Sequence, residues 1–320
     1  MGFDSLLGNA QLKENLTGSL SRGHISHFYL LSGPEGSGKK TLARLLSAAI
    51  LCRSSGPRPC MECIACRKVL DGNHPDCITV DDPEKKTVTV KMVREAREDM
   101  FIRPNESDHK IYLIPRAQEM RMEAQNALLK VLEEPPKYGV FLLLTDNPDK
   151  MLPTIRSRCT ELSLQPLSPE ILIPELERRF PQVQREVLEA AAQRSGGFLG
   201  QAISLLESGN ENQPQIEAFV NAFSENNALE LTRLLVPLER WSRDDLAGLL
   251  MQWRELLEEA MICRSGLRTL SPQSRKLAGA KTSQELYSAA QILQKTQTCL
   301  GSNVSPAAVC GYLSWALRVL

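Results

Sequence analysis

Residues 33–41 read Gly-Pro-Glu-Gly-Ser-Gly-Lys-Lys-Thr, and they join a short apolar run to a helical stretch. This strand-to-helix context is the one that a phosphate-binding loop, or P-loop, requires. Glycines let backbone N–H groups converge on phosphate oxygens, and the start of the helix adds positive potential. The sequence therefore predicts a P-loop in which Lys39 reaches the outer phosphates and the backbone ligands come from Gly33, Gly36 and Gly38.

The position after Lys39 departs from the P-loop pattern, because an active P-loop carries serine or threonine there to bind magnesium. Lys40 offers a second ammonium group instead, which repels a divalent cation. Thr41 has a hydroxyl, but a residue one position further on points about 100° further around the helix. We expect poor support for metal-assisted hydrolysis, while nucleotide binding itself stays open.

Short β-rich runs alternate with helical stretches on both sides of this loop, which is typical of a parallel sheet covered by helices. We expect five strands, at His27–Ser32, Cys77–Val80, Lys110–Ile114, Val140–Thr145 and Glu161–Leu164. We expect helices between them at Lys39–Leu51, Val90–Met100 and Arg116–Glu134. Continuous apolar runs in the third and fourth strands indicate that these strands are central and buried on both faces.

No convincing strand follows Pro166, so the rest of the chain is expected to be helical. Three short helices are predicted at Ser168–Phe180, Val183–Arg194 and Leu199–Ser208. A polar linker is predicted next, at Gly209–Gln215. Longer amphipathic helices follow, for example at Arg243–Met261 and Ser305–Leu320. The predicted order is an α/β domain at 1–166, a small helical domain at 167–208 and a larger helical domain at 209–320.

The strand expected at Lys110–Ile114 lacks the acidic end of an active P-loop ATPase. In such an enzyme this strand ends in aspartate, which holds magnesium and polarises the attacking water. Here the chain continues as Pro115-Arg116-Ala117-Gln118, and Glu119 lies further on, where we expect a solvated helix residue. Since the strand end offers neither a metal ligand nor a base, we expect no active ATPase.

Four of the nine cysteines lie close together, as Cys52-x7-Cys60-x2-Cys63-x2-Cys66. Two consecutive CxxC steps supply four thiolates at the short separations that tetrahedral zinc takes. An iron–sulfur cluster is the alternative, since thiolates with this spacing also bind iron. We favour a structural zinc module at residues 52–66. We expect the remaining cysteines to be packed thiols; they are Cys77, Cys159, Cys263, Cys299 and Cys310.

The charge balance argues against a free-standing nucleic-acid-binding protein. Lysine and arginine number 38, aspartate and glutamate also number 38, and aromatic residues make up 5% of the chain. A protein that binds nucleic acid by itself usually has a basic excess, so any contact with DNA should be local or shared with partners. No apolar run reaches the length of a bilayer and Met1–Gln11 lacks an export signal, which predicts a cytoplasmic protein.

Arg158 lies in the tripeptide Ser157-Arg158-Cys159, just before the last expected strand. A lone arginine at this position is most often an ordinary surface charge. A planar guanidinium can also neutralise the charge that grows on a transferring phosphoryl group, as an arginine finger does when it completes a neighbour's site. Arg158 is therefore a candidate catalytic residue that acts in trans.

These stretches together resemble the clamp-loader AAA+ family of bacterial DNA polymerase III. The resemblance is carried by Phe3–Gly8, His27–Gly33, the P-loop, the four-cysteine segment, His74–Asp76, Ala124–Pro136 and Ser157–Cys159. It covers residues 1 to about 205, and the helical remainder fits the oligomerising collar of that family by its length and character. The resemblance implies an AAA+ domain with a five-stranded parallel sheet at 1–166, a three-helix lid at 167–208 and an all-α collar at 209–320.

Within this family, the ATP-hydrolysing gamma/tau motors keep both the P-loop hydroxyl and the acidic strand end. Delta-prime subunits tend to lose both and to keep the Ser-Arg-Cys tripeptide. This sequence departs from the motors at Lys40 and Pro115, and it has Gly200 where an active relative carries a sensing arginine. The resemblance therefore implies a non-hydrolysing, delta-prime-like stator that donates Arg158 to the ATP site of a neighbouring motor subunit.

The resemblance also implies partners: gamma/tau motor and delta subunits, and, through the assembled complex, a sliding clamp and primed DNA. Thr145 or Asn147 would take the place that senses the γ-phosphate in an active relative. The degenerate nucleotide site would comprise Gly33, Gly36, Gly38, Lys39, Lys40, Thr41 and Thr145. One alternative is a working gamma/tau-like motor that uses Thr41 for magnesium. A zinc-dependent DNA-binding protein is a second alternative, and the neutral charge disfavours it.

Overall fold

Five parallel strands form the centre of the first part of the chain, in the spatial order β2-β3-β4-β1-β5. They are β1 (Phe28–Ser32), β2 (Cys77–Thr79), β3 (Lys110–Ile114), β4 (Gly139–Thr145) and β5 (Thr160–Ser163). Every residue of β1 and β4 is buried, as expected for central strands covered on both faces. The predicted five-stranded parallel sheet is confirmed, and each predicted strand end lies within one residue of the observed end.

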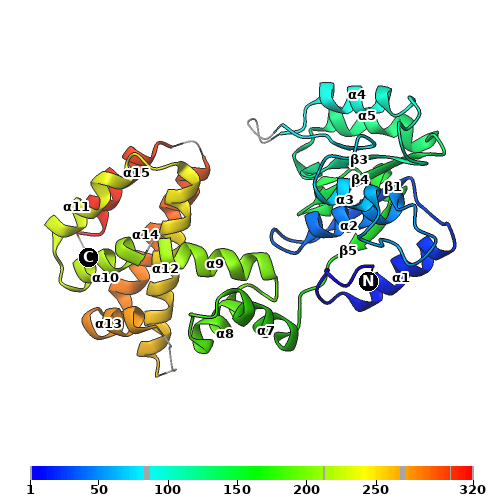
Figure 1. The fold of residues 1–320 in the computed structure, drawn as a ribbon. Helices are drawn as coiled ribbons and strands as arrows, with labels where there is room; N and C mark the ends of the chain where they lie inside the picture. Colours follow the sequence, from blue (N-terminus) through cyan, green and yellow to red (C-terminus); the bar gives the residue numbers. More distant parts are fainter. Residues whose placement is uncertain (1, 83–86, 212, 267–270, 303, 319–320) are drawn as a thin grey trace. The chain divides into compact units, whose positions relative to one another are not determined.

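The computed structural model describes residues 2–82, 87–211, 213–266, 271–302 and 304–318. The chain separates into two units, Met1–Leu206 and Glu207–Leu320, and each unit is described by itself (Figure 1). Within the described residues, no helix combines the length and the apolar character needed to cross a membrane.

Helices cover both faces of the sheet in the first unit, which gives three layers (Figure 1). Successive strand residues point to opposite faces, so the side chains of β1 divide between two separate cores. One core packs against α1 (Ala10–Ser21), α2 (Lys39–Leu51) and α3 (Ile64–Leu70). The opposite core packs against α4 (Val90–Asp99), α5 (Met122–Glu133) and α6 (Pro153–Arg156). The P-loop is therefore held between a fully buried strand, β1, and a helix that is almost fully buried, α2.

The single helix predicted at Arg116–Glu134 is wrong, because two helical segments occupy this range. A short 3-10 helix, η1 (Ala117–Glu119), is followed by α5, which begins at Met122. Met120 and Arg121 between them have extended backbone conformations. This stretch contains neither glycine nor proline, so its sequence carries none of the residues that usually mark a break.

Three helices with a core of their own complete the first unit, as predicted from the sequence. They are α7 (Pro169–Arg179), α8 (Arg185–Arg194) and α9 (Leu199–Glu211). Leu172, Leu176 and Leu188 are almost fully buried in this small core. Helix α9 continues beyond Ser208, where the sequence predicted its end.

The predicted linker at Gly209–Gln215 is wrong, since α9 and α10 (Gln213–Ser224) occupy this stretch apart from residue 212, which lies outside the described residues. Pro214 is the second residue of α10, a position at which proline is tolerated because the backbone N–H there has no partner within the helix. The polar residues of this stretch that the structure describes therefore belong to helices.

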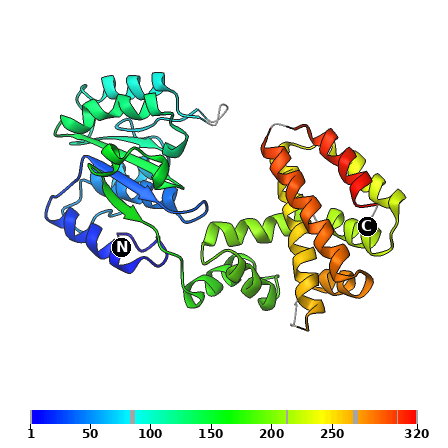
Figure 2. The same cartoon turned by 180° about the vertical axis from the view of Figure 1, so that it is seen from behind.

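The second unit is helical throughout its described part (Figure 2). After α10 it contains α11 (Ala228–Leu238), α12 (Arg243–Arg264), α13 (Pro272–Ala280), α14 (Ser283–Gly301) and α15 (Pro306–Ala316). Trp253 of α12 is fully buried and stacks on Phe219, with 4.3 Å between ring centroids. The helix predicted at Ser305–Leu320 is shorter than expected, and Val319 and Leu320 lie outside the described residues.

Candidate functional site

The P-loop of this chain binds its own lysine side chain. Lys39 is the first residue of α2 and is 8% exposed. Its Nζ donates hydrogen bonds to the carbonyl oxygens of Gly33 at 2.6 Å and Pro34 at 2.8 Å. The same ammonium lies 2.5 Å from Oδ1 of Asp146. The group that the sequence predicted to reach phosphate is therefore neutralised and held by the chain itself.

Asp146 follows the end of β4 and is fixed in place by Gln118 of η1. The Gln118 side-chain Nε2 donates to Asp146 Oδ2 at 3.0 Å, and the Asp146 backbone N–H donates to Gln118 Oε1 at 3.3 Å. Asp146 was not predicted as a residue of this site. The available signal was its position, since β4 pairs with β1 up to Ser32 and Thr145, so the residues that follow both strands lie at one edge of the sheet.

The end of β3 carries a positive charge where an active ATPase has a carboxylate. Arg116 Nη2 donates to Oδ1 of Asp81 and, at 3.0 Å, to the carbonyl oxygen of Asp82. Glu119, expected to be solvated, is exposed in η1. Asp81 therefore supplies an acidic side chain near this strand end, and its carboxylate is paired with Arg116.

Of the two threonines in the predicted site, one is exposed and the other is engaged in a turn. Lys40 and Thr41 are both exposed on α2. Thr145 is fully buried, and its Oγ1 donates to the Asn147 carbonyl oxygen at 2.9 Å and accepts from the Asn147 N–H at 3.2 Å. The predicted loop residues lie at one site, but the hydroxyl of Thr145 is engaged in its own turn.

The four cysteines predicted as metal ligands lie together. Their Sγ atoms are all within 4.8 Å of one another, and the pairs Cys52–Cys63 and Cys60–Cys66 are 3.9 Å apart. Four thiolates around a zinc ion at about 2.3 Å would be separated by about 3.8 Å. The donor set and its spacing therefore fit a tetrahedral zinc ion.

Backbone groups favour the thiolate form at the exposed side of this cysteine cluster. The N–H groups of Cys63 and Glu62 lower the pKa of the Cys60 thiol to about 6. Burial instead raises the pKa of Cys66, whose Sγ lies 3.6 Å from the carbonyl oxygen of Ala48 in α2. The cluster thus combines the partly exposed sulfur atom of Cys60 with the buried sulfur atom of Cys66, which belongs to the same core as α2.

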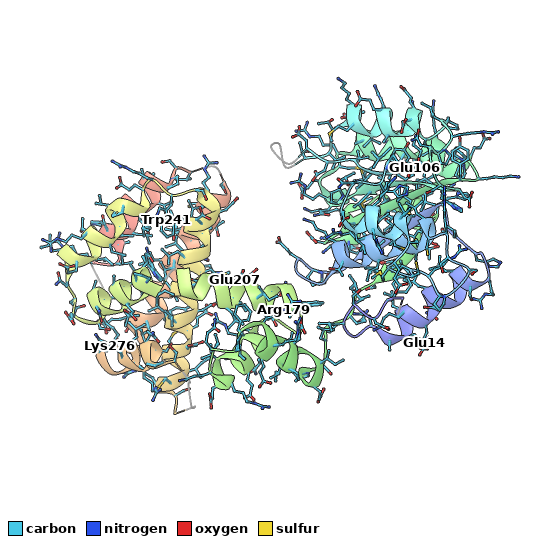
Figure 3. The ribbon with its side chains drawn as sticks, viewed as in Figure 1. Glu14, Glu106, Arg179, Glu207, Trp241 and Lys276 are labelled. Atoms are coloured by element: carbon cyan, nitrogen blue, oxygen red, sulfur yellow. The ribbon has the colours of Figure 1, made fainter. Side chains whose placement is uncertain are left out.

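A buried aspartate organises the loop beside the cysteine segment. Both carboxylate oxygens of Asp76 accept backbone N–H groups, from Asn105 at 2.6 Å, Glu106 at 2.8 Å and Ser107 at 2.9 Å. Burial tends to raise the pKa of this carboxyl, but the three backbone donors outweigh burial and hold the pKa below its ordinary value. Lys68 of α3 lies 2.5 Å from Glu106, which is labelled in Figure 3, so the loop is also tied to the cysteine segment.

Arg158 is exposed between α6 and β5. Its Nη1 donates to the Thr154 carbonyl oxygen at 3.1 Å, and within the described ranges it forms no ion pair. Arg156, two residues earlier, is paired with Asp149 at 2.9 Å. Of these two neighbouring arginines, Arg158 is the one whose charge remains available to a ligand outside the chain.

The Gln125 side chain forms hydrogen bonds with the backbone of residues 150 and 152, which precede Arg158 in the chain. This α5 residue is 4% exposed, and its Nε2 donates to the carbonyl oxygens of Met120 at 3.1 Å and Lys150 at 3.0 Å. Its Oε1 accepts the N–H of Leu152 at 2.8 Å. Gln125 was not predicted as a functional residue, although a glutamine among apolar core positions is a signal of a buried polar contact.

We expect Gln125→Met to lower the free energy of unfolding of the chain by about 2 kcal/mol, because a thioether of similar size leaves buried backbone groups without partners. Chemical denaturation followed by circular dichroism measures the change. Asn126→Met is the matched control, since Asn126 is exposed on the same helix and its replacement should change stability by less than about 0.5 kcal/mol. Equal effects of the two substitutions would contradict the assigned role of Gln125.

A family model described as DNA polymerase III, delta subunit, matches residues 8–168, which is half of the chain. The chain belongs to this family. Subunit tau of DNA polymerase III from Bacillus subtilis is 31% identical over 210 residues, which cover 64% of this chain and 37% of tau. Subunit delta′ from the same organism is 37% identical over 157 residues, 49% of this chain and 47% of delta′. The matched region thus spans about half or less of either relative.

Proteins from two further organisms are also similar to the chain. Subunit delta′ of Pseudomonas aeruginosa is 36% identical over 178 residues, 55% of this chain and 54% of the relative. A structure of a gamma subunit-related protein from Thermotoga maritima aligns with a TM-score of 0.48 and 17% identity, over 97% of this chain and 99% of its own. The family model establishes the family. Because tau and delta′ relatives match comparably, these similarities do not distinguish the two types of subunit.

Proposed function

We propose that the chain is a non-hydrolysing, delta-prime-like subunit of a DNA polymerase III clamp loader that acts in chromosomal replication. The observation that carries this proposal is the state of Lys39, which is bound to two loop carbonyls and to Asp146. A triphosphate at this loop would have to displace all three contacts and would meet the Asp146 carboxylate, which repels phosphate oxygens.

Magnesium fits this site no better than triphosphate. Lys40 replaces the magnesium-binding hydroxyl, Thr41 is exposed, and Pro115 replaces the aspartate of an active strand end. Arg116 adds a cation beside that strand end, although its charge is balanced by Asp81. These departures support a subunit that does not turn over ATP and disfavour the gamma/tau-like motor.

For the chain's positive contribution, we assign Arg158 the role of an arginine finger that completes the ATP site of a neighbouring motor subunit. A guanidinium in trans stabilises the charge that develops on the transferring phosphoryl group. The exposure of Arg158, beside an Arg156 that is already paired, supports this role. A separate AAA+ domain at 1–166, lid at 167–208 and oligomerising collar at 209–320 belong to the same proposal.

The proposed setting is the cytoplasm. The proposed partners are gamma/tau motor and delta subunits, and the assembled complex would act on a sliding clamp and primed DNA. Cys52, Cys60, Cys63 and Cys66 would hold one zinc ion. That ion would have a structural role, because four thiolates leave no position open for a substrate.

We expect the purified chain to hydrolyse no ATP above background in the presence of magnesium, because position 40 lacks the magnesium-binding hydroxyl and the end of β3 lacks a base. Phosphate release is the measurement, with Lys39→Ala as the control for contaminating activity. Magnesium-dependent turnover by the isolated chain that disappears in Lys39→Ala would contradict the proposal and favour a motor subunit.

A further inference from the structure

A backbone hydrogen bond joins the P-loop to the start of α9. The N–H of Gly200, the second residue of α9, donates to the carbonyl oxygen of Gly36 at 2.9 Å. Gly36 is the central glycine of the P-loop. In the sequence it follows the two residues whose carbonyl groups bind Lys39, and it precedes Lys39. Two segments far apart in the sequence therefore meet at the loop that was expected to bind phosphate.

Both glycines are required for this approach. A Cβ atom at Gly200 would lie 2.5 Å from Gly36 Cα, and a Cβ atom at Gly36 would lie 2.5 Å from the Gln201 backbone nitrogen. Backbone atoms at such distances cannot yield as a flexible side chain can. Gly36 also has a φ of +75°, which disfavours any other residue. An arginine at position 200, as in an active relative, could not make this contact without shifting the chain.

The hydrogen bond satisfies a group that the helix leaves free. The first N–H groups of an α-helix have no acceptor within the helix. In α9 one of them, Gly200 N–H, finds its acceptor on the P-loop. A second backbone bond fixes the turn before α9, because Leu167 N–H donates to the Gly197 carbonyl oxygen at 2.8 Å.

We propose that Gly36 and Gly200 form a clasp that holds the start of α9 on the P-loop without any nucleotide. The chain makes this contact with its own backbone groups, so the position of the start of α9 on the P-loop does not depend on ATP. This goes beyond the proposed function, since the clasp needs neither Arg158 nor a partner subunit.

Hydrogen exchange of the Gly200 amide in the wild-type full-length chain tests the clasp directly. Without an acceptor this N-terminal helix amide would exchange rapidly, so its protection in nucleotide-free protein reports the bond to Gly36. We expect slow exchange that millimolar magnesium–ADP leaves unchanged. Rapid exchange without nucleotide, or protection that appears only with magnesium–ADP, would overturn the proposal.

Gly200→Ala provides the second test. Gly200 has no strained φ, so the added methyl group acts through the close contact alone. We expect exchange of peptides covering residues 33–41 and 196–203 to accelerate about tenfold or more. Gly18→Ala is the control, since a Cβ there meets only Arg22 side-chain atoms at 3.6 Å or beyond. Unchanged exchange in folded Gly200→Ala would refute the clasp; if that variant does not fold, the wild-type measurement decides. Neither outcome bears on Arg158, which is tested separately.

Discussion

Arg158→Ala should lower ATP hydrolysis at the neighbouring site that this arginine is proposed to complete by about 10³-fold or more, because an arginine finger in trans contributes about 10³–10⁵ in rate. The guanidinium is planar and always charged, so it can donate two parallel hydrogen bonds to phosphoryl oxygens while their charge develops. In this chain it is exposed, and its one described hydrogen bond is to a backbone carbonyl group, which a phosphate can displace.

Single-turnover hydrolysis by the reconstituted complex is the appropriate measurement, since other motor sites would hide the loss at one site in steady state. The amplitude of the fast phase should fall by the share of one site, while size-exclusion chromatography shows an intact assembly. Arg156→Ala is the matched control, because Arg156 is already paired with Asp149. Full turnover by an assembled Arg158→Ala complex would mean that Arg158 is an ordinary surface charge.

The Arg158→Lys variant tests whether the positive charge of Arg158 or the planar shape of its guanidinium group is needed for ATP hydrolysis. Arg158→Lys keeps the positive charge but loses the planar fork, so we expect turnover between those of the wild type and the alanine variant. A lysine variant as slow as the alanine variant would still agree with a finger that acts through paired hydrogen bonds. A lysine variant as active as the wild type would show that charge alone is sufficient.

The fold could be predicted because local sequence and burial agree in the first unit. Phe28–Ser32 and Gly139–Thr145 are apolar over nearly their whole length, and both strands are fully buried. The P-loop glycines fixed where one strand ends and one helix begins. The break at Met120 and the helices on either side of residue 212 were missed, because each depends on contacts and helix ends that composition does not reveal.

The sequence predicted which residues form the P-loop site, but it did not predict the contacts that Lys39 makes there. Lys39 was expected to be free for phosphate, yet it is bound to Asp146, a residue 107 positions further along the chain. Lys40 and Pro115 are departures that a motif shows directly. Ion pairs between distant residues such as Lys39 and Asp146 become visible only when the sheet places the ends of β1 and β4 side by side.

Cys66→Ser should abolish zinc binding and remove on the order of 10 kcal/mol of local folding free energy, because metal binding and folding are coupled in four-thiolate sites. Cys66 is fully buried, and it packs against α2 next to Ala48. The loss should therefore reach the helix that follows the P-loop and lower the melting temperature of the whole first unit. Metal analysis should find one zinc ion per wild-type chain and none in the variant.

Cys263→Ser provides the control, because Cys263 belongs to α12 in the second unit and is not one of the four clustered cysteines. It should keep one zinc ion and the wild-type melting temperature. Visible absorption of the purified protein separates the two metals considered for this site, since an iron–sulfur cluster is coloured and tetrahedral zinc, with a filled d shell, is not. Wild-type protein that melts identically with and without a strong chelator, and that contains no metal, would show that the four thiols are packed without an ion. The cluster would then support α2 by burial of Cys52 and Cys66 alone, and Cys66→Ser would cost no more than the loss of one packed thiol.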